Sequence, residues 1–314
     1  MTSHNQALIA PLIYYDLLER PLTALEIFKY LRAGDPEISF FSVWQELKRS
    51  NLAQQKNGLY FLPGQDQLIA VRQKRMKLAQ MKWKKLKRSG KYLALVPWLR
   101  LAAVTGSLTA HNTKESSDFD LLIVLKKNRL WLGRLLLTGL VGLLKKRRHG
   151  QLTQDRLCLN CYLTENNLEI TAQAKSRDWH SAQEYGRLTP ILEIQKGSYA
   201  KFVGANNWLS SFLKNYPWPN SRNAKKIKAP LFFSWLRQTA EALMGGRIGD
   251  TLEKIAGQWQ KKRINKKRLL EQSGAQDQVF VSDYCLMFHP QSKSDRLMKE
   301  FNLKMAQYYA TDSN

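Results

Sequence analysis

The stretch VTGSLTAHNTKESSDFDLLIVL, residues 104–125, predicts a strand ending at Gly106, a turn, and a second strand that carries two acids. Side chains alternate along a strand, so Asp118 and Asp120 share one face. Two carboxylates this close repel each other, and a divalent cation between them removes the repulsion. Mg²⁺ or Mn²⁺ suits the pair, because hard cations bind through one or two carboxylates and substrate phosphates. We therefore expect Asp118 and Asp120 to be catalytic metal ligands.

The Gly-Ser turn ahead of the acids predicts a phosphate-binding element. Glycine lets the backbone approach a phosphate closely, which favours Gly106 at the contact. The hydroxyl of Ser107 and nearby free N–H groups can hold phosphate oxygens. We expect Gly106 and Ser107 to bind the phosphates of a substrate beside the two aspartates.

The segments around this stretch predict an α+β core over residues 92–174. RLWLGRLLLTGLVGLLKKRR from residue 129 is helical in pattern, whereas RLCLNCYL (156–163) and NLEIT (167–171) are typical of strands. The remaining residues, 175–314, carry mostly helical patterns and one short strand near the end. They predict a helical C-terminal domain.

Residues 1–65 resemble a winged helix-turn-helix. Three helical patterns precede a hairpin whose turn is Lys56-Asn57-Gly58, and Thr23 with Glu26 predicts a capping box. The segment FSVWQELKRS, residues 41–50, falls at the place of the recognition helix. Such domains bind nucleic acid or dock onto protein, and both interpretations stay open.

A basic linker helix is predicted over residues 66–91, because good helix formers carry many bases and no acid from residue 67 to 90. A merely solvated helix normally mixes both signs. The pattern favours a nucleic-acid-binding surface made by Arg72, Lys74, Arg75, Lys82, Lys84, Lys85, Lys87 and Arg88.

The overall charge points to a polyanionic partner. The chain has 50 Lys and Arg against 25 Asp and Glu, a net charge of +25, which makes nucleic acid the first candidate. An anionic membrane surface would in addition require an amphipathic anchor, a lipidation signal or a spanning helix. The most apolar window begins at Leu130, contains Arg134 and is shorter than the roughly 20 residues of a span. With no signal-peptide pattern at residues 1–21 and few cysteines, we expect a cytoplasmic protein.

The joint pattern of Val104–Ser107, the gap, Asp118-Phe119-Asp120 and the apolar LLIVL resembles the polymerase-β-type nucleotidyltransferases. With the winged helix, it is similar to an uncharacterised bacterial subgroup of that superfamily. The resemblance implies a polymerase-β-like core with a small mixed sheet, set between the winged helix and the helical domain. It also implies two metal ions on Asp118 and Asp120, an NTP on Gly106 and Ser107, and transfer of a nucleoside monophosphate to a hydroxyl.

One position departs from the superfamily pattern. Active members carry a third carboxylate on a later strand, where this chain has Asn160. Asp155, just before that strand, and Glu169, after it, are the candidates to substitute. The departure implies a slow or specialised transferase, a site completed by a partner, or a nucleotide-binding protein.

Polar residues at helical spacing follow the core. Arg177, Asp178, His180 and Glu184 could approach the aspartates, although a solvated helix face is the favoured interpretation. Cys158 and Cys161 form a C-x-x-C inside a strand and are expected to be buried free thiols rather than a metal or redox site.

Three functions remain open from the sequence. The first is Mg²⁺-dependent nucleotidyl transfer, with tRNA-like RNA as the favoured acceptor because basic charge is spread over several segments. The second is a DNA-binding regulator, antitoxin-like, whose nucleotidyltransferase fold serves as a binding module. The third is nucleotidyl transfer to a protein or small molecule.

Overall fold

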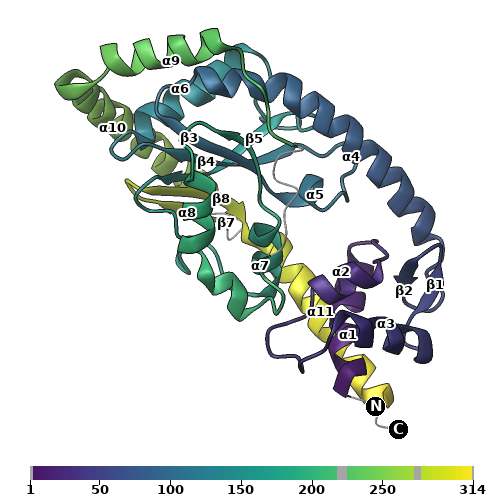
Figure 1. Cartoon of the computed structure of the whole chain (residues 1–314). Helices are drawn as coiled ribbons and strands as arrows, with labels where there is room; N and C mark the ends of the chain where they lie inside the picture. The colour runs from purple at the N-terminus through teal and green to yellow at the C-terminus, as the bar shows by residue number, and fades with distance from the viewer. Residues whose placement is uncertain (1–2, 218–224, 272–276, 313–314) are drawn as a thin grey trace.

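The computed structural model describes residues 3–217, 225–271 and 277–312, with a six-stranded mixed sheet at its centre (Figure 1). β4 and β5 run parallel, and the other neighbours in the sheet are antiparallel. The strands lie in the order β6 (Thr189–Glu193), β3 (Leu99–Val104), β4 (Phe119–Leu125), β5 (Leu157–Thr164), β8 (Cys285–Pro290) and β7 (Asp277–Val281). The chain is therefore α+β, with a mixed sheet as expected.

The two faces of the sheet are buried in two separate cores, which explains the continuous apolar run of β4. Leu122 and Val124 point into a core shared with the N-terminal helices. Leu121 and Ile123 point into the opposite core, which contains Trp83. The first core is covered by α1 (Ser3–Leu17), α7 (Trp179–Gly186), α8 (Ser198–Ala205) and α11 (Gln291–Asp312). The second is covered by α4 (Leu68–Gly90), η1 (Lys91–Leu95), α6 (Leu130–Leu143), α9 (Leu231–Leu243) and α10 (Gly246–Glu271).

The N-terminal unit has the expected order of elements, namely α1, α2 (Ala24–Lys29), α3 (Phe40–Arg49) and a hairpin of β1 (Gln54–Lys56) with β2 (Leu59–Phe61). Thr23 and Glu26 form the predicted capping box at the start of α2. Asn57 and Gly58 both have positive φ, as a two-residue hairpin turn requires. Leu22 pairs with Tyr60 and adds a further extended segment to the hairpin.

The C-terminal helix ties this unit to the sheet. α11 begins beside the sheet and runs along the N-terminal helices (Figure 1). Its Phe301 packs edge-on against Tyr14 of α1, and Nζ of Lys304 lies 2.8 Å from a carboxylate oxygen of Asp16. The C-terminal helix thus packs against the N-terminal unit through α1.

Two expectations differ from the structure. Residues 175–314 are not purely helical, because β6, β7 and β8 complete the sheet. β8 pairs with β5, whose edge would otherwise leave backbone groups without partners. NLEIT is not a strand, since only Asn167 forms a bridge, back to Thr164. Within the described part of the chain, no helix is both long and apolar enough to cross a membrane.

Candidate functional site

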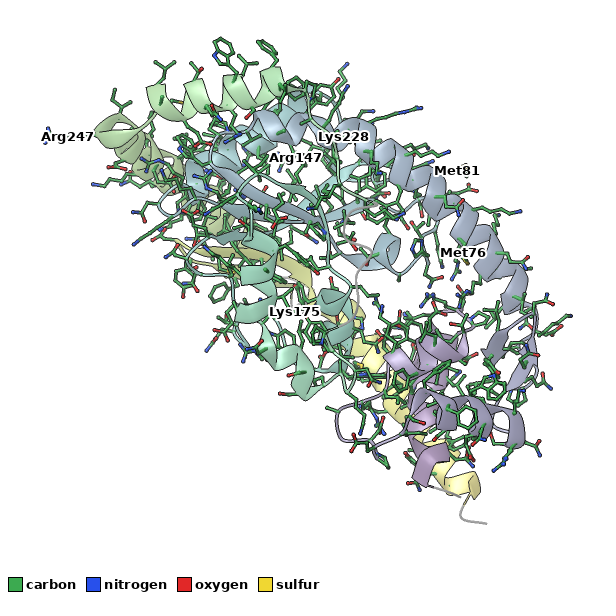
Figure 2. The ribbon with its side chains drawn as sticks, viewed as in Figure 1. Met76, Met81, Arg147, Lys175, Lys228 and Arg247 are labelled. Atoms are coloured by element: carbon green, nitrogen blue, oxygen red, sulfur yellow. The ribbon has the colours of Figure 1, made fainter. Side chains whose placement is uncertain are left out.

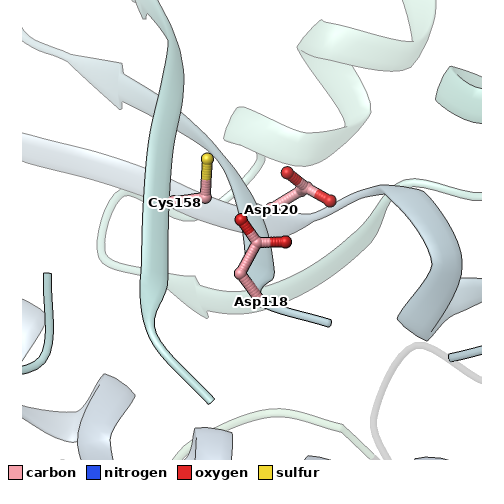
Figure 3. A group of neighbouring side chains, drawn as sticks. All are labelled: Asp118, Asp120 and Cys158. Carbon is pink, nitrogen blue, oxygen red and sulfur yellow. The ribbon is translucent and has the colours of Figure 1, made fainter. Parts of the chain in front are cut away.

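The two aspartates meet at the start of β4, beside the start of β5 (Figure 3). Asp118 directly precedes β4, and Asp120 is its second residue. The parallel register sets Asp120 opposite Cys158 of β5. One ligand atom from each of Asp118, Asp120 and Cys158 lies within 4.8 Å of the other two. The pairing expected from the alternation along the strand is therefore present, together with a thiol that the sequence analysis did not place there.

Gly106 lies directly against the Asp120 carboxylate. It ends the loop after β3 with φ of +69°, and a Cβ built there would lie 2.6 Å from Oδ2 of Asp120. The preceding residue, Thr105, donates its N–H to the carbonyl oxygen of Asp120 over 3.0 Å. A side chain at 106 would be strained by the positive φ and would have to displace the Asp120 carboxylate. Ser107, the other predicted phosphate-binding residue, is half-buried in the short helix α5 (Gly106–Thr109).

Asn160 also reaches the pair. The register between β4 and β5 shifts after Leu121, whose partner is Leu159, so that Leu122 faces Cys161 and Asn160 is the extra residue of a bulge. Its Nδ2 donates a hydrogen bond to Oδ1 of Asp120 over 3.3 Å. The predicted position of Asn160 beside the acids is thus what the structure shows, with an amide where a third carboxylate was considered.

The two substitute acids lie elsewhere. Asp155 accepts a hydrogen bond from the buried Lys82 over 2.8 Å and pairs with Lys85 as well. Burial alone would raise the pKa of Asp155, but these two lysines hold it below its usual range. Glu169 lies outside the sheet, is half exposed and pairs with Arg177. Neither acid belongs to the cluster around Asp118 and Asp120 among the residues described.

Arg148 was missed by the sequence reasoning. Its Nη1 lies 2.9 Å from Oδ2 of Asp118 and donates a hydrogen bond to Sγ of Cys158 over 3.3 Å. It belongs to a basic run, residues 145–149, held to the start of β5 by bonds such as Arg148 N–H to the carbonyl of Leu157. The signal was available in part: these bases precede β5, and parallel neighbours β4 and β5 start at one edge of the sheet.

Burial and the neighbouring negative charges disfavour ionisation of Asp120. Burial, the charge of Asp118 and the charge of Glu184 raise the pKa of Asp120 to about 7, while Arg148 opposes the rise. Burial and the two aspartates also raise the pKa of Cys158 to about 12. The thiol is therefore protonated at neutral pH and is a weak ligand, which leaves two carboxylates as the donors.

Glu184 lies on α7 and belongs to the group of polar residues, 177–184, that the sequence analysis considered as neighbours of the aspartates. Its neighbours on that element have structural roles. Asp178 caps α7 by accepting the N–H of Ser181 over 2.7 Å, and Nδ1 of His180 is hydrogen-bonded to the Tyr14 hydroxyl over 2.6 Å. Of this group, Glu184 is the one whose charge acts on Asp120.

The predicted basic surface on α4 divides into two sets. Arg72, Arg75 and Lys82 point inward: Arg72 pairs with Glu26 over 2.7 Å, Arg75 bonds Asn112 over 3.0 Å, and Lys82 is 1% exposed. These three are not available to nucleic acid, because α4 packs one face on the protein and buries them there. Lys74, Lys84, Lys85 and Arg88 are exposed, and Lys87 is half-buried.

The two carboxylates could hold a divalent cation. Oδ2 of Asp118 is buried and, among the described residues, accepts no hydrogen bond, although Arg148 lies near it. No family model, curated protein or solved structure matches the chain. Two adjacent carboxylates that repel each other fit Mg²⁺ or Mn²⁺, because a cation offsets their repulsion. These ions keep several water ligands and need few protein oxygens.

Proposed function

We propose that the chain is a Mg²⁺-dependent nucleotidyltransferase that moves a nucleoside monophosphate from an NTP to a hydroxyl on RNA. The observation that carries the proposal is the contact between Gly106 and Asp120. A glycine turn, where a side chain would be strained and would displace the acid, lies against one member of a carboxylate pair. A glycine turn packed against a carboxylate pair brings backbone N–H groups near a candidate cation site, which is the arrangement that suits a bound phosphate.

The residues divide the work as follows. Asp118 and Asp120 would hold divalent metal, and Gly106 and Ser107 would hold the phosphates. Metal bound there would draw charge from the triphosphate and make the acceptor hydroxyl a better nucleophile. The hydroxyl would lose its proton to water, its oxygen would form a bond to the α-phosphorus, and the bond from that phosphorus to the leaving pyrophosphate would break. Arg148, which is 44% exposed in its side chain and pairs with Asp118, would offer a guanidinium to the triphosphate.

The amide of Asn160 in place of a third carboxylate predicts a low rate of nucleotidyl transfer. Its amide bonds Asp120 but adds no negative charge, so the cation at the acceptor side is held by fewer charges. Stabilisation of developing charge is the main source of rate in phosphoryl transfer. A slow or narrowly specific transferase follows from this.

RNA is the favoured acceptor because exposed basic side chains lie both beside the site and farther from it. The run at residues 145–149 is exposed beside the aspartates, and Lys74, Lys84 and Arg88 are exposed on α4. Phosphate contacts from such residues release counterions, so binding should weaken steeply with salt. Transfer to a small molecule would show no such dependence.

The direct test is labelling. Purified protein with Mg²⁺, total RNA and each labelled NTP in turn should give labelled RNA. Asp118→Asn with Asp120→Asn should give none. A matched control, Asp66→Asn with Asp295→Asn, removes two exposed acids far along the chain and should label RNA like the wild type. Equal labelling by the two double variants would refute the proposal.

A second candidate, a DNA-binding regulator, is favoured by the exposed face of α3. Phe41 and Trp44 lie on that face, and Nζ of Lys48 sits 3.6 Å from the centroid of the Trp44 ring. A basic and aromatic helix in this position suits a nucleic-acid groove. This candidate predicts sequence-selective duplex binding that survives loss of both aspartates and is lost in Trp44→Ala with Lys48→Ala.

A further inference from the structure

One face of α9 is apolar and exposed in the part of the chain that the structure describes. Phe233, Arg237 and Glu241 recur every four residues and make the inner face, where Phe233 packs on Tyr92 of η1. The opposite face carries large apolar side chains together with the exposed Gln238 and Thr239, and side chains of α9 project away from the molecule (Figure 2). The exposed set on α9 is Leu231, Phe232, Trp235, Leu236 and Leu243, of which Leu231 is 90% exposed. Single exposed apolar residues are ordinary, but a continuous stripe is not.

α10, which follows α9 after a short turn, also exposes an apolar side. Ile248, Leu252, Ile255 and Trp259 are all exposed and are spaced by four, three and four residues. That spacing keeps them on one side of the helix. The inner side of α10 is occupied by Gln260, which is 3% exposed and donates to the carbonyl of Trp131 over 2.8 Å. Two consecutive helices therefore each expose an apolar side.

The charges around the stripe are mostly positive, and Asp250, 60% exposed in its side chain at the start of α10, is paired with Arg129. Lys228 and Arg247 are exposed at the two ends of α9 (Figure 2). The one acid between residues 225 and 249 is Glu241, which points inward and accepts the N–H of Trp98 over 2.8 Å. On α10, Lys254 and Lys262 are exposed beside the stripe. An apolar face bordered by bases matches a partner that is apolar inside and anionic at its surface.

Physical chemistry separates the possible occupants. A nucleic acid would present phosphates to Leu231, Leu236 and Leu243, and aliphatic side chains gain little against them. A second copy of the chain would bring two bodies of charge +25 together with basic rims in contact. A phospholipid surface satisfies both features, since acyl chains accept Leu, Phe and Trp while headgroup phosphates accept Lys and Arg. The amphipathic anchor that a membrane role requires is thus present.

We propose that the α9–α10 face binds an anionic phospholipid membrane surface. α9 lies in the plane of the interface, with Phe232 and Trp235 inserted at the boundary of headgroups and acyl chains. Lys228 and Arg247 contact lipid phosphates at its ends. The proposal is independent of the chemistry at Asp118 and Asp120, and it places that chemistry at a membrane surface.

Vesicle binding tests the proposal with the full chain. Wild-type protein should co-sediment with vesicles of phosphatidylglycerol and phosphatidylcholine and remain in solution with phosphatidylcholine alone. Phe232→Glu with Trp235→Glu should lower the partition coefficient at least about tenfold. The matched control Leu25→Glu with Met81→Glu changes the net charge equally at apolar side chains on α2 and α4 that are 61% and 54% exposed. It should bind like the wild type.

A conservative variant guards against misfolding. Trp235→Phe keeps the apolar face, and brominated lipids should quench the fluorescence of the wild type more than that of this variant. The proposal would be overturned by no binding to anionic vesicles, by equal binding of the two glutamate double variants, or by equal quenching with and without Trp235. A wild-type dimer in solution that Phe232→Glu with Trp235→Glu dissociates would also overturn it, by assigning the face to a second copy. Loss of RNA binding in that variant without loss of vesicle binding would assign the face to nucleic acid.

Discussion

Asn160 donates a hydrogen bond from Nδ2 to Oδ1 of Asp120 over 3.3 Å, from a bulge that points it at the acids. An aspartate at 160 would place a third carboxylate beside the pair. We expect Asn160→Asp to lower the Mg²⁺ concentration needed for half-maximal RNA labelling by about tenfold, because one more anionic ligand strengthens a hard-cation site. Asn160→Ala, the control, should not lower it. A higher Mg²⁺ requirement in Asn160→Asp would contradict a metal at this position.

Gly106→Ala should damage both stability and activity. The residue has φ of +69°, and the new Cβ would lie 2.6 Å from Oδ2 of Asp120. We expect a loss of about 1–3 kcal/mol in the free energy of unfolding, measured with urea, and loss of RNA labelling. Gly139→Ala in α6 is the control, since nothing lies within 4 Å of its Cβ. It should gain about 0.5–1 kcal/mol and label normally; similar effects at both glycines would disprove the role of the contact.

Asp120 should make the metal-free protein pH-sensitive. Burial and Asp118 raise its folded pKa to about 7, above the roughly 4 of an unfolded aspartate. The folded state therefore favours the protonated acid, and the associated stability is complete below pH 4 and lost as the pH rises through 7. In EDTA at pH 8, Asp120→Asn should melt on the order of 3 °C higher than the wild type, with a smaller difference at pH 5. A pH-independent difference would show that ionisation of Asp120 is not the cause.

The effect of Mg²⁺ on the melting temperature tests the same carboxylates. At pH 8 it should raise the melting temperature of the wild type, because ligands that bind the folded state stabilise it. It should leave Asp120→Asn nearly unchanged. Thermal scans with and without 5 mM Mg²⁺, a concentration of roughly physiological order, provide the measurement. An equal Mg²⁺ effect on both proteins would place the cation elsewhere.

Lys82 and Lys84 should separate structure from binding on α4. Nζ of Lys82 donates to the carbonyl oxygens of Glu115 and Ser117 over 2.9 and 2.7 Å and so holds the loop that leads into Asp118. Lys82→Met should cost about 3 kcal/mol in unfolding free energy, because buried acceptors lose their partner. Lys84→Met, at an exposed position, should leave stability within about 0.5 kcal/mol and reduce the salt dependence of RNA binding. A loss of stability in Lys84→Met, or a reduced salt dependence of RNA binding with unchanged stability in Lys82→Met, would contradict the separation of α4 into buried and exposed lysines.

The local parts of the site were predictable from sequence. Period-two alternation is enough to put Asp118 and Asp120 on one face, and the motif after β3 is enough to mark Gly106. The inward position of Asn160 was expected as well. These features depend on the order of residues within one or two neighbouring strands.

The remaining parts depend on contacts between distant segments. β8 pairs with β5 more than a hundred residues away, and no local pattern specifies that partner. The burial of Lys82 depends on Asp155, so composition alone made a structural lysine look like a binding one. Arg148 approaches Asp118 only because β4 and β5 are parallel neighbours.

Mn²⁺ binding tests the central claim most directly, because it depends on neither the acceptor nor the rate. Mn²⁺ can be titrated by electron paramagnetic resonance in the presence of a non-hydrolysable NTP analogue. The wild type and Glu169→Gln, which removes an exposed acid paired with Arg177, should both bind Mn²⁺, whereas Asp118→Asn with Asp120→Asn should leave it free. Undiminished Mn²⁺ binding by the double variant would contradict the assignment of these two aspartates as the metal ligands.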